Sequence, residues 1–276
     1  MLTAGEVLRR TAGWLADRGS PSPRLDAELL LAHVLGVERI ALYTDHDRPL
    51  TAAETDAYRA LVARRGRREP VAYLTGERAF RRLRLRVGPG VLVPRPETEG
   101  LVEWALEVAP PGAAVLDWGT GSGAVALALA DERPDLRVAA LDRSADALQV
   151  ARANDPHGRV EWLRSDGFAA VAGRRFAVVA ANPPYLSPAD LAAAPAELAH
   201  EPADALVAGP TGLEALETLA AGGPAHLEPG GWLLAEVGAG QAEAVQALWR
   251  DAGMDEVSSR PDLAGIPRIV GGRDAR

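Results

Sequence analysis

Residues 113–124 read AAVLDWGTGSGA, and this stretch decides the fold. Its first part, Ala113 to Leu116, has the composition of a short buried strand, and Ala124 to Ala130 continues as a helix. Between them, three glycines at alternate positions allow tight backbone curvature and close approach of a ligand. In an open α/β sheet, ligands bind beyond the C-terminal ends of the strands, near the first strand–helix turn. The stretch therefore predicts an α/β fold with a ligand site at the glycine loop.

The spacing of the glycines narrows the class of ligand. Gly119 to Gly123 follow the pattern Gly-x-Gly-x-Gly, whereas dinucleotide-binding folds use Gly-x-Gly-x-x-Gly. The shorter loop favours a small nucleoside ligand such as S-adenosylmethionine (AdoMet) over NAD. The N-terminus of the following helix is expected to present free N–H groups to an anionic part of that ligand.

Helices and strands alternate from about Thr98 to the end of the chain. Strands separated by helices imply a mostly parallel sheet that is covered on both faces. The segments around Val257 and Ile269 are predicted to be edge strands. The other predicted strands are 113–116, 138–141, 160–163, 176–180 and 232–237, and the predicted helices are 101–108, 124–130, 145–153, one from 213, and 242–249.

Acidic residues follow the second and third predicted strands. Asp142 comes directly after the second strand, where a carboxylate can accept both ribose hydroxyls of a nucleoside. The alternative is that Asp142 caps the next helix, a role for which Ser144 is equally suited. Asp166 ends the third strand and is expected to form a wall for the adenine. Together with the glycine loop, these positions predict a nucleoside site.

The fourth predicted strand of the sheet ends at Asn182-Pro183-Pro184-Tyr185. Two prolines end the strand and stiffen the turn. Asn182 can both donate to and accept from a planar amide, the Pro183 carbonyl can accept a second N–H, and Tyr185 can lie on the face of the substrate. This arrangement fits a site that holds a planar nitrogen nucleophile for methyl transfer, and the alternative is a turn without chemistry.

The N-terminal part of the chain has a different pattern. The first ~75 residues read as a small helical bundle, with capping-box spacing at Thr3 and again at Thr51. Arginines at 82, 84 and 86 then alternate with apolar residues, which predicts a β-hairpin with its arginines outward. Its turn is expected at Gly88-Pro89-Gly90 and its returning strand at 91–93. We therefore predict an N-terminal domain over 1–75, a linker over 76–93 and a catalytic domain over 94–276.

Composition and charge exclude several classes of protein. The chain has no cysteine, so disulfides and thiolate chemistry are excluded. Its five histidines share no metal-ligand spacing, and no metal site is expected. The net charge of −8 argues against a general nucleic-acid binder. No apolar run is long enough to span a membrane and no secretion signal is evident, so a cytoplasmic protein is expected.

The basic residues are unevenly placed. All of them are arginine, and eleven lie between Arg59 and Arg95 beside only two acidic residues, Glu69 and Glu77. One interpretation is a solvated surface, and the other is a docking surface for a partner that carries acidic groups.

On these motifs the chain resembles the bacterial release factor glutamine methyltransferases, the HemK/PrmC group. The resemblance covers essentially the whole length. It is carried by the glycine loop, by the Asn182–Tyr185 segment, and by three further stretches: PVAYLTGE at 70–77, VPRPETE at 93–99 and PGGW at 229–232. It implies a class I AdoMet-dependent methyltransferase domain, a Rossmann-like seven-stranded sheet, behind a helical N-terminal domain and a hairpin linker.

The resemblance also implies the activity and its residues. The enzyme would methylate the side-chain amide nitrogen (N5) of the glutamine in the Gly-Gly-Gln motif of peptide-chain release factors, would leave S-adenosyl-L-homocysteine as product, and would act as a monomer. At Gly167 this chain has glycine where the family often has a large residue beside the adenine. The implied cofactor contacts are Gly119, Thr120, Gly121, Ser122, Gly123, Asp142, Gly167 and Asn182; the implied catalytic residues are Asn182, Pro183 and Tyr185, and these with Pro184 would bind the glutamine.

Two other functions remain open on the sequence. An adenine-N6 DNA methyltransferase uses the same Asn-Pro-Pro-Tyr chemistry on a flipped base, but the acidic net charge and the lack of an evident target-recognition domain disfavour it. An AdoMet-binding interaction module without catalysis is disfavoured by the intact Asn182 pocket.

Overall fold

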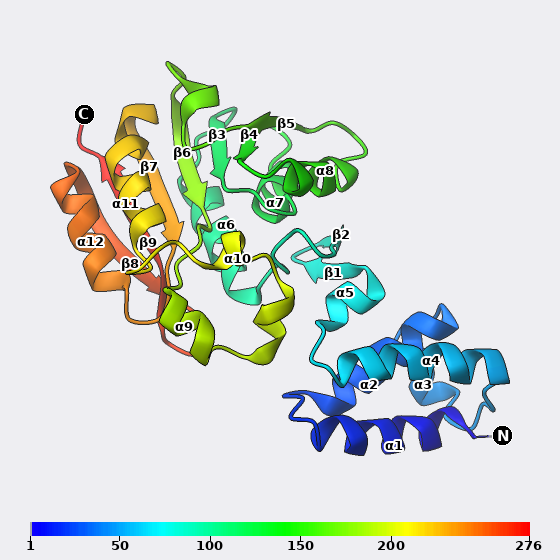
Figure 1. Cartoon of the computed structure of the whole chain (residues 1–276). Helices are drawn as coiled ribbons and strands as arrows, with labels where there is room; N and C mark the ends of the chain where they lie inside the picture. The colour runs from blue at the N-terminus through cyan, green and yellow to red at the C-terminus, as the bar shows by residue number, and fades with distance from the viewer. Residues whose placement is uncertain (1) are drawn as a thin grey trace. The chain divides into compact units, whose positions relative to one another are not determined.

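The computed structural model describes residues 2–276 and divides the chain into two compact units, Met1–Glu77 and Arg78–Arg276. The colours of Figure 1 separate them, since the first unit runs from blue to cyan and the second from cyan to red. Within the part of the chain that the structure describes, every helix is too short or too polar to span a membrane.

The first unit is helical, as predicted. Both expected capping boxes are present: the Thr3 and Thr51 side chains each accept from the third backbone N–H of their helix, and Glu6 and Glu54 return the bond. Buried apolar side chains from these helices, with Leu31 and Tyr58 among them, form one core cluster. The helices are α1 (Ala4–Ala16), α2 (Pro23–Leu35), α3 (Ala41–Thr44), α4 (Ala52–Arg65) and α5 (Val71–Thr75).

The second unit contains a seven-stranded sheet in the order β5-β4-β3-β6-β7-β9-β8. The strands β3 to β7 pair in parallel, and β9 is antiparallel to both of its neighbours. The chain reverses its direction of travel across the sheet between β3 and β6, which is where ligands bind in such folds. The strands are β3 (Ala114–Trp118), β4 (Arg137–Asp142), β5 (Val160–Arg164), β6 (Phe176–Ala181), β7 (Leu227–Glu236), β8 (Met254–Pro261) and β9 (Pro267–Asp274).

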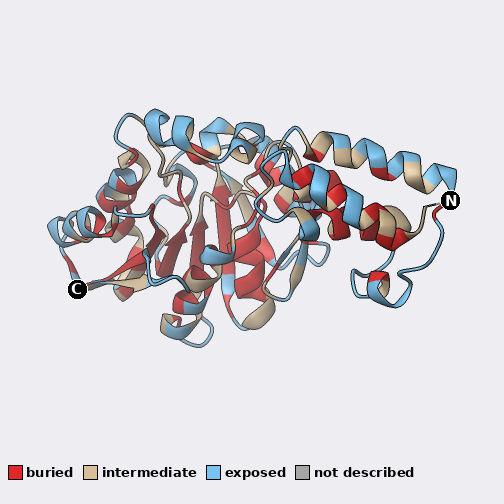
Figure 2. Ribbon diagram, turned by 90° about the horizontal axis from the view of Figure 1, so that it is seen from below, coloured by how far each residue is buried: buried red, intermediate tan, exposed pale blue. Residues whose placement is uncertain are grey.

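Helices cover both faces of the sheet, which confirms the predicted layers. The buried strands run through the middle of the unit, and exposed residues lie on the outer sides of the helices (Figure 2). Side chains of α6 and α7 share one core cluster with the sheet, and those of α11 and α12 share the other. The helices are α6 (Glu99–Val108), α7 (Ala124–Glu132), α8 (Ala145–Ala153), α9 (Pro188–Ala193), α10 (Ala203–Leu206), α11 (Glu214–Gly222) and α12 (Ala242–Asp251); four short 3-10 turns are η1 (Pro96–Thr98), η2 (Ala169–Val171), η3 (Ala196–His200) and η4 (Gly223–His226).

Two strand predictions were wrong. The hairpin pairs β1 (Glu77–Phe80) with β2 (Leu83–Arg86), and residues 91–93 are not a strand. The chain reverses earlier than predicted, because Arg81 adopts a left-handed conformation with φ 48°. The arginines at 82, 84 and 86 are exposed as expected. At the far side of the sheet only β8 is an edge strand, since β9, which holds Ile269, lies between β7 and β8.

Candidate functional site

Four candidate site residues lie side by side at the carboxyl ends of four neighbouring parallel strands. Trp118 on β3 pairs with Leu141 on β4 and with Ala181 on β6, and Ala181 pairs with Ala235 on β7. The next residue on each strand is therefore in register, and adjacent strands are about 4.8 Å apart. This row consists of Asp142, Gly119, Asn182 and Glu236.

The glycine loop provides space above its backbone. Gly119 and Gly121 have φ values of 74° and 55°, and a Cβ added at either residue would meet no atom within 4 Å. Gly123 differs, because its Cβ would come within 2.9 Å of Trp162, so this glycine allows helix α7 to pack closely. A ligand at this loop would therefore lie over Gly119 and Gly121.

The loop's N–H groups are less available than the sequence suggested. The N–H groups of Gly119 and Thr120 both donate to the Leu141 carbonyl, at 2.9 and 3.0 Å. At the start of α7, the Ala126 N–H donates to the Asp117 carboxylate at 3.1 Å. The Ala124 and Val125 N–H groups, by contrast, have no acceptor among residues 2–276, so the start of α7 can still donate to a ligand.

Asp142 holds the loop from the neighbouring strand. Its two carboxylate oxygens accept from the Gly121 N–H at 2.9 Å and from the Ser144 N–H at 2.8 Å. The Ser144 side chain caps α8 by accepting from the Ala147 N–H at 3.1 Å, so the capping role falls to Ser144. Each Asp142 oxygen retains a lone pair, and the residue is only partly buried. The carboxylate can therefore accept further hydroxyl groups.

Asp117 is a buried carboxyl beneath the loop. The Thr120 hydroxyl donates to it at 2.5 Å, and the side chain is 1% exposed. Burial raises the pKa of Asp117 to about 7, against the lowering effect of its Thr120 and Ala126 donors. These contacts hold the glycine loop and the start of helix α7. Asp117 therefore has a structural role in supporting the ligand site.

The side-chain amide of Asn182 has a hydrogen-bond partner for its nitrogen but none for its oxygen among residues 2–276. Its Nδ2 donates to the Thr98 hydroxyl at 3.1 Å, and that hydroxyl donates to Glu236 Oε2 at 2.6 Å. The Asn182 Oδ1 atom is buried and, among residues 2–276, has no hydrogen-bond partner. An unsatisfied buried acceptor is costly unless a ligand donates to it. This atom is the clearest sign of a binding site in the second unit.

The rest of the Asn182–Tyr185 segment is held rigidly. Gln241 Nε2 donates to the Tyr185 carbonyl at 2.9 Å, and the Tyr185 hydroxyl donates to Glu236 Oε1 at 3.3 Å. Pro183 is buried, and no residue among 2–276 donates to its carbonyl oxygen. Asn182 Oδ1 and the Pro183 carbonyl therefore provide two acceptors within one turn.

Burial changes the protonation of two groups in this network. It raises the pKa of Glu236 to about 7, against the lowering effect of the Thr98 and Tyr185 hydroxyls. Burial, helped by the Glu236 carboxylate, also raises the pKa of Tyr185 well above the ordinary value. The phenol therefore stays protonated and donates.

The expected adenine side is open. Gly167 has φ 58°, and an added Cβ there would meet nothing within 4 Å. Phe168 is already engaged, since its ring lies 6.2 Å from Trp118 and stacks at 4.7 Å on His226. Asp166 is exposed and lies beyond the end of β5. Gly167 follows β5, whose last residue Arg164 pairs with Asp142, so it lies near the carboxyl ends of the strands where the glycine loop lies.

Sequence reasoning missed Thr98 and Glu236. The available signal was Glu236, a single acidic residue after an apolar run at the end of β7. A glutamate is rarely buried unless it has a specific partner or function. Thr98 follows the PRPE stretch, and it reaches Asn182 only through tertiary folding across 84 residues of sequence.

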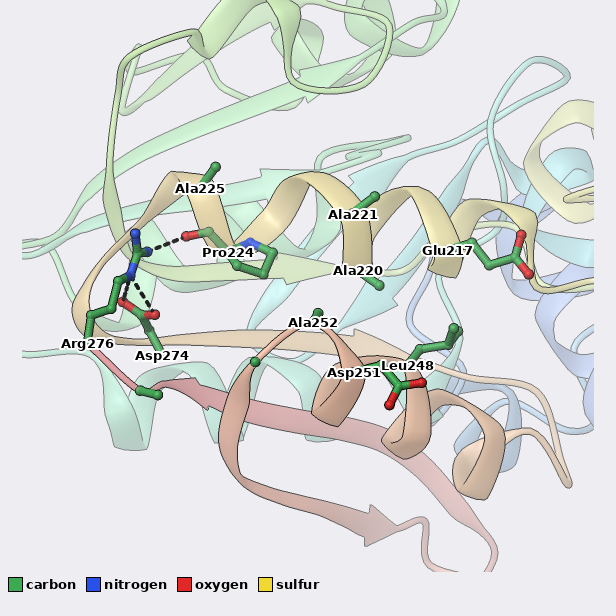
Figure 3. Close-up of a pocket in the computed structure, with 12 residues that line it drawn as sticks. Glu217, Ala220, Ala221, Pro224, Ala225, Leu248, Asp251, Ala252, Asp274 and Arg276 are labelled. Atoms are coloured by element: carbon green, nitrogen blue, oxygen red, sulfur yellow. Dashed lines mark hydrogen bonds and ion pairs between the residues drawn. The ribbon is translucent and has the colours of Figure 1, made fainter.

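A groove of about 690 Å³ lies elsewhere on the second unit. Figure 3 shows it between α11, the end of α12 and the chain's last residues, where Arg276 reaches Asp274 and the Pro224 carbonyl. Arg273 pairs with Trp232, near the middle of β7, whereas Ile269 pairs with Glu236 at its end. The groove therefore lies toward the opposite ends of the parallel strands and forms no part of the candidate site.

Comparisons with known proteins identify the family of the chain. Two family models match the chain: "PrmC N-terminal domain" over residues 6–76 and "Methyltransferase small domain" over residues 98–212. The chain is 49% identical to a release factor glutamine methyltransferase of Burkholderia pseudomallei, over 98% of this chain and 96% of that protein. It is 42% identical to the one of Geobacter sulfurreducens, with the same coverage.

A solved structure supports the fold alone. The crystal structure of a methyltransferase from Pyrococcus furiosus aligns with a TM-score of 0.52 at 18% identity, covering 70% of this chain and 89% of that one.

Proposed function

The chain belongs to the release factor glutamine methyltransferase family, and we propose that it transfers a methyl group from AdoMet to the N5 amide nitrogen of the glutamine in the Gly-Gly-Gln motif of peptide-chain release factors. This modification would serve translation termination. The observation that carries the proposal is the buried Asn182 Oδ1 atom after β6, to which no group among residues 2–276 donates.

The residues at the sheet edge fit AdoMet. The open space over Gly119 and Gly121 admits a ligand, and the lone pairs of Asp142 suit two ribose hydroxyls. Thr120, Ser122, Gly123 and Gly167 would complete the surroundings of the cofactor. When bound, AdoMet supplies an electrophilic methyl group on its sulfonium, and no metal is needed for that chemistry.

The chain's own contribution is to orient a weak nucleophile. An amide nitrogen is planar and barely basic, so its lone pair must be presented in a fixed direction. Asn182 Oδ1 and the Pro183 carbonyl would accept its two N–H groups, while Pro184 stiffens the turn and Tyr185 covers the face of the amide. Orientation and preorganised polar contacts would supply most of the rate. No strong base is required before the transfer, because S-adenosyl-L-homocysteine would be the leaving group and one N–H proton would leave the methylated nitrogen for water afterwards.

The proposal is tested by methyl transfer from labelled AdoMet to purified release factor, with intact-mass measurement and peptide mapping. We expect one added methyl group on the Gly-Gly-Gln glutamine. A release factor with Gln→Ala at that position should take up no label. Label on duplex DNA instead would favour the adenine-N6 alternative, which would also bind DNA with a steep salt dependence.

We further propose that the β1–β2 hairpin helps to dock the release factor. Its exposed arginines stand beside the glycine loop, because Asn154 Nδ2 donates to the carbonyls of both Arg86 and Ser122 at 3.0 Å. The Asn154 Oδ1 atom also accepts from the Arg86 N–H at 2.7 Å. A basic surface fixed at this place suits an acidic region of a protein substrate.

Charge reversal should reveal this docking surface. Changing Arg82, Arg84 and Arg86 together to Glu is expected to raise KM for a release factor about tenfold or more, because several favourable charges become repulsive. The KM for a short Gly-Gly-Gln peptide should stay within about twofold, since a peptide carries no distant acidic region. Steady-state kinetics with both substrates gives the comparison.

A matched control reverses three other exposed arginines, Arg137, Arg175 and Arg250, which lie on β4, before β6 and on α12. These changes alter the net charge equally and should leave both KM values near those of the original enzyme. Equal effects of the hairpin variant on the release factor and the peptide would contradict a docking role.

The remaining proposals concern the protein's setting. We propose that it works in the cytoplasm, where release factors act, as a monomer and without stable binding of nucleic acid. The net charge of −8 supports the last of these.

A further inference from the structure

We propose that Thr98 and Glu236 are positioning residues, which fix the orientation of the Asn182 amide and the Tyr185 phenol for methyl transfer. The inference rests on the proposed function. It assigns a role to two buried polar residues that lie one hydrogen bond away from the residues expected to hold the substrate.

The Thr98 hydroxyl fixes which way the Asn182 amide faces. A hydroxyl has one hydrogen and two lone pairs. Thr98 lies 2.6 Å from Glu236 Oε2, and an ionised carboxylate only accepts, so the single hydrogen of Thr98 points to Glu236. Its lone pair is then available to Asn182 Nδ2 at 3.1 Å. The amide must therefore turn Oδ1 toward the place where a substrate N–H would lie.

Glu236 has a buried side chain that the fold alone does not require. It is 1% exposed and makes no ion pair with an arginine among residues 2–276. A buried carboxylate is costly, and an apolar residue of similar volume would stabilise the end of β7 better. Its two oxygens instead accept separately from Thr98 and Tyr185, so one carboxylate orients both ends of the Asn182–Tyr185 segment.

The network matters because the substrate needs acceptors. If the Asn182 amide rotated by 180°, its NH2 group would face the N–H of the substrate, and two donors would oppose each other. A Thr98 hydroxyl held as an acceptor prevents this rotation, since Oδ1 would then face a lone pair. The lone pair of the substrate nitrogen is thus oriented before the reaction. This orientation would supply most of the rate acceleration.

Substitution of Thr98 tests the proposal directly. Thr98→Val keeps the shape and removes the hydroxyl, and we expect kcat to fall about 100-fold, while the Kd for AdoMet stays within about twofold because Asp142 and the glycine loop hold the cofactor. Thr98→Ser keeps the hydroxyl and should recover kcat to within about fivefold of the original enzyme. Equal impairment of the Val and Ser variants, or unchanged kcat in Thr98→Val, would overturn the proposal.

A readout that does not depend on activity separates this inference from the proposed function. In NMR spectra of the full-length enzyme, the side-chain NH2 of Asn182 should exchange slowly with water, and Thr98→Val should make it exchange faster. An unprotected NH2 in the original enzyme would overturn the inference. If the protection is present and release factor is still not methylated, the network stands and the proposed substrate is wrong.

The pH profile provides a further readout. Because the pKa of Glu236 is raised to about 7, its ionised form, which accepts from both hydroxyls, predominates only above that pH. The rate should therefore rise with increasing pH through about 7 as one proton is lost. The charged groups that face Glu236 are Glu97, which raises its pKa, and Arg268, which lowers it.

Glu236→Gln distinguishes Glu236 from Asp117, a second buried carboxyl whose pKa burial raises to about 7. The variant should be slow and its rate should no longer change through pH 7, because the titrating group is gone. Asp117 also has a raised pKa of about 7, but it contacts Thr120 and Ala126 and none of the network residues. A pH dependence that persists in Glu236→Gln would belong to another group, such as Asp117, and would overturn the assignment to Glu236.

Discussion

Asn182→Ala is expected to lower kcat for release factor methylation about 10³-fold, as for the loss of a preorganised polar contact at a reacting centre. The variant loses a buried acceptor that has no hydrogen-bond partner among residues 2–276, and with it the proposed contact to the substrate N–H. The Kd for AdoMet should rise by no more than about tenfold, because Asn182 is only one of the expected cofactor contacts and Asp142 and the open loop would hold the rest of the cofactor. Single-turnover methyl transfer and calorimetric titration of AdoMet measure the two quantities.

Asn182→Asp is the matched variant, since it keeps the size of the side chain. The oxygen that replaces Nδ2 would face the Thr98 lone pair at about the same 3.1 Å, where Nδ2 now donates. The Thr98 hydroxyl cannot donate to it without leaving Glu236. We therefore expect Asn182→Asp to be nearly as slow as Asn182→Ala. Because Asp keeps an acceptor oxygen toward the substrate, a variant within about tenfold of the original rate would contradict the need for the contact between Nδ2 and the Thr98 hydroxyl.

The layers of the second unit were predictable because its local patterns agree with its global fold. Apolar runs separated by amphipathic helices require a parallel sheet with both faces covered. The end of the sheet was not predictable in the same way. Strand β9 is antiparallel to its neighbours and lies between β7 and β8. This order depends on which strands pair, and a single short apolar segment does not specify its pairing partner.

The hairpin shows how a strong turn signal misleads. Gly88-Pro89-Gly90 has the composition of a turn, yet the chain reverses at Arg81 and Arg82. After the hairpin, Val93 donates its N–H to the buried Glu201 carboxylate at 2.9 Å, across 108 residues of sequence. A tertiary hydrogen bond, with the Arg95–Glu201 ion pair beside it, thus takes the place of the strand pairing that the local pattern suggested.

The candidate site likewise contains residues that the sequence predicted and residues that only the structure revealed. The glycine loop, Asp142 and Asn182 were found from the sequence because each directly follows a strand, and parallel strands end at one edge. Thr98 and Glu236 were missed because they meet across 138 residues and share no local motif. The residues proposed to touch the ligand could therefore be predicted here, while those that hold them in place required the structure.

Asp142→Ala is the second change with a large expected effect, on cofactor affinity. The carboxylate orients the loop through the Gly121 N–H at 2.9 Å and keeps lone pairs for the ribose. Hydrogen bonds to a charged group contribute about 1.5–3 kcal/mol each, so losing two should weaken AdoMet binding about 100-fold or more. At saturating AdoMet, kcat should fall by less than about tenfold, since the Asn182 network is unchanged.

Asp146→Ala provides the control for Asp142→Ala. Asp146 is an exposed carboxylate four residues further on, in the first turn of α8. Its removal changes the net charge equally and should leave the Kd within about twofold. Calorimetric titration of AdoMet and of S-adenosyl-L-homocysteine gives both values. A Kd for Asp142→Ala that matches Asp146→Ala would place the ribose elsewhere.

Asp142→Asn distinguishes the two tasks of this carboxylate. An asparagine oxygen can still accept one backbone N–H, but its NH2 group opposes the other N–H donor, either Gly121 or Ser144. If ribose binding dominates, Asn and Ala should weaken AdoMet to a similar extent, because one ribose acceptor is lost and the charge is gone. If loop orientation dominates, Asn should recover about tenfold of the affinity that Ala loses, since a rotamer with Oδ1 toward Gly121 restores that bond.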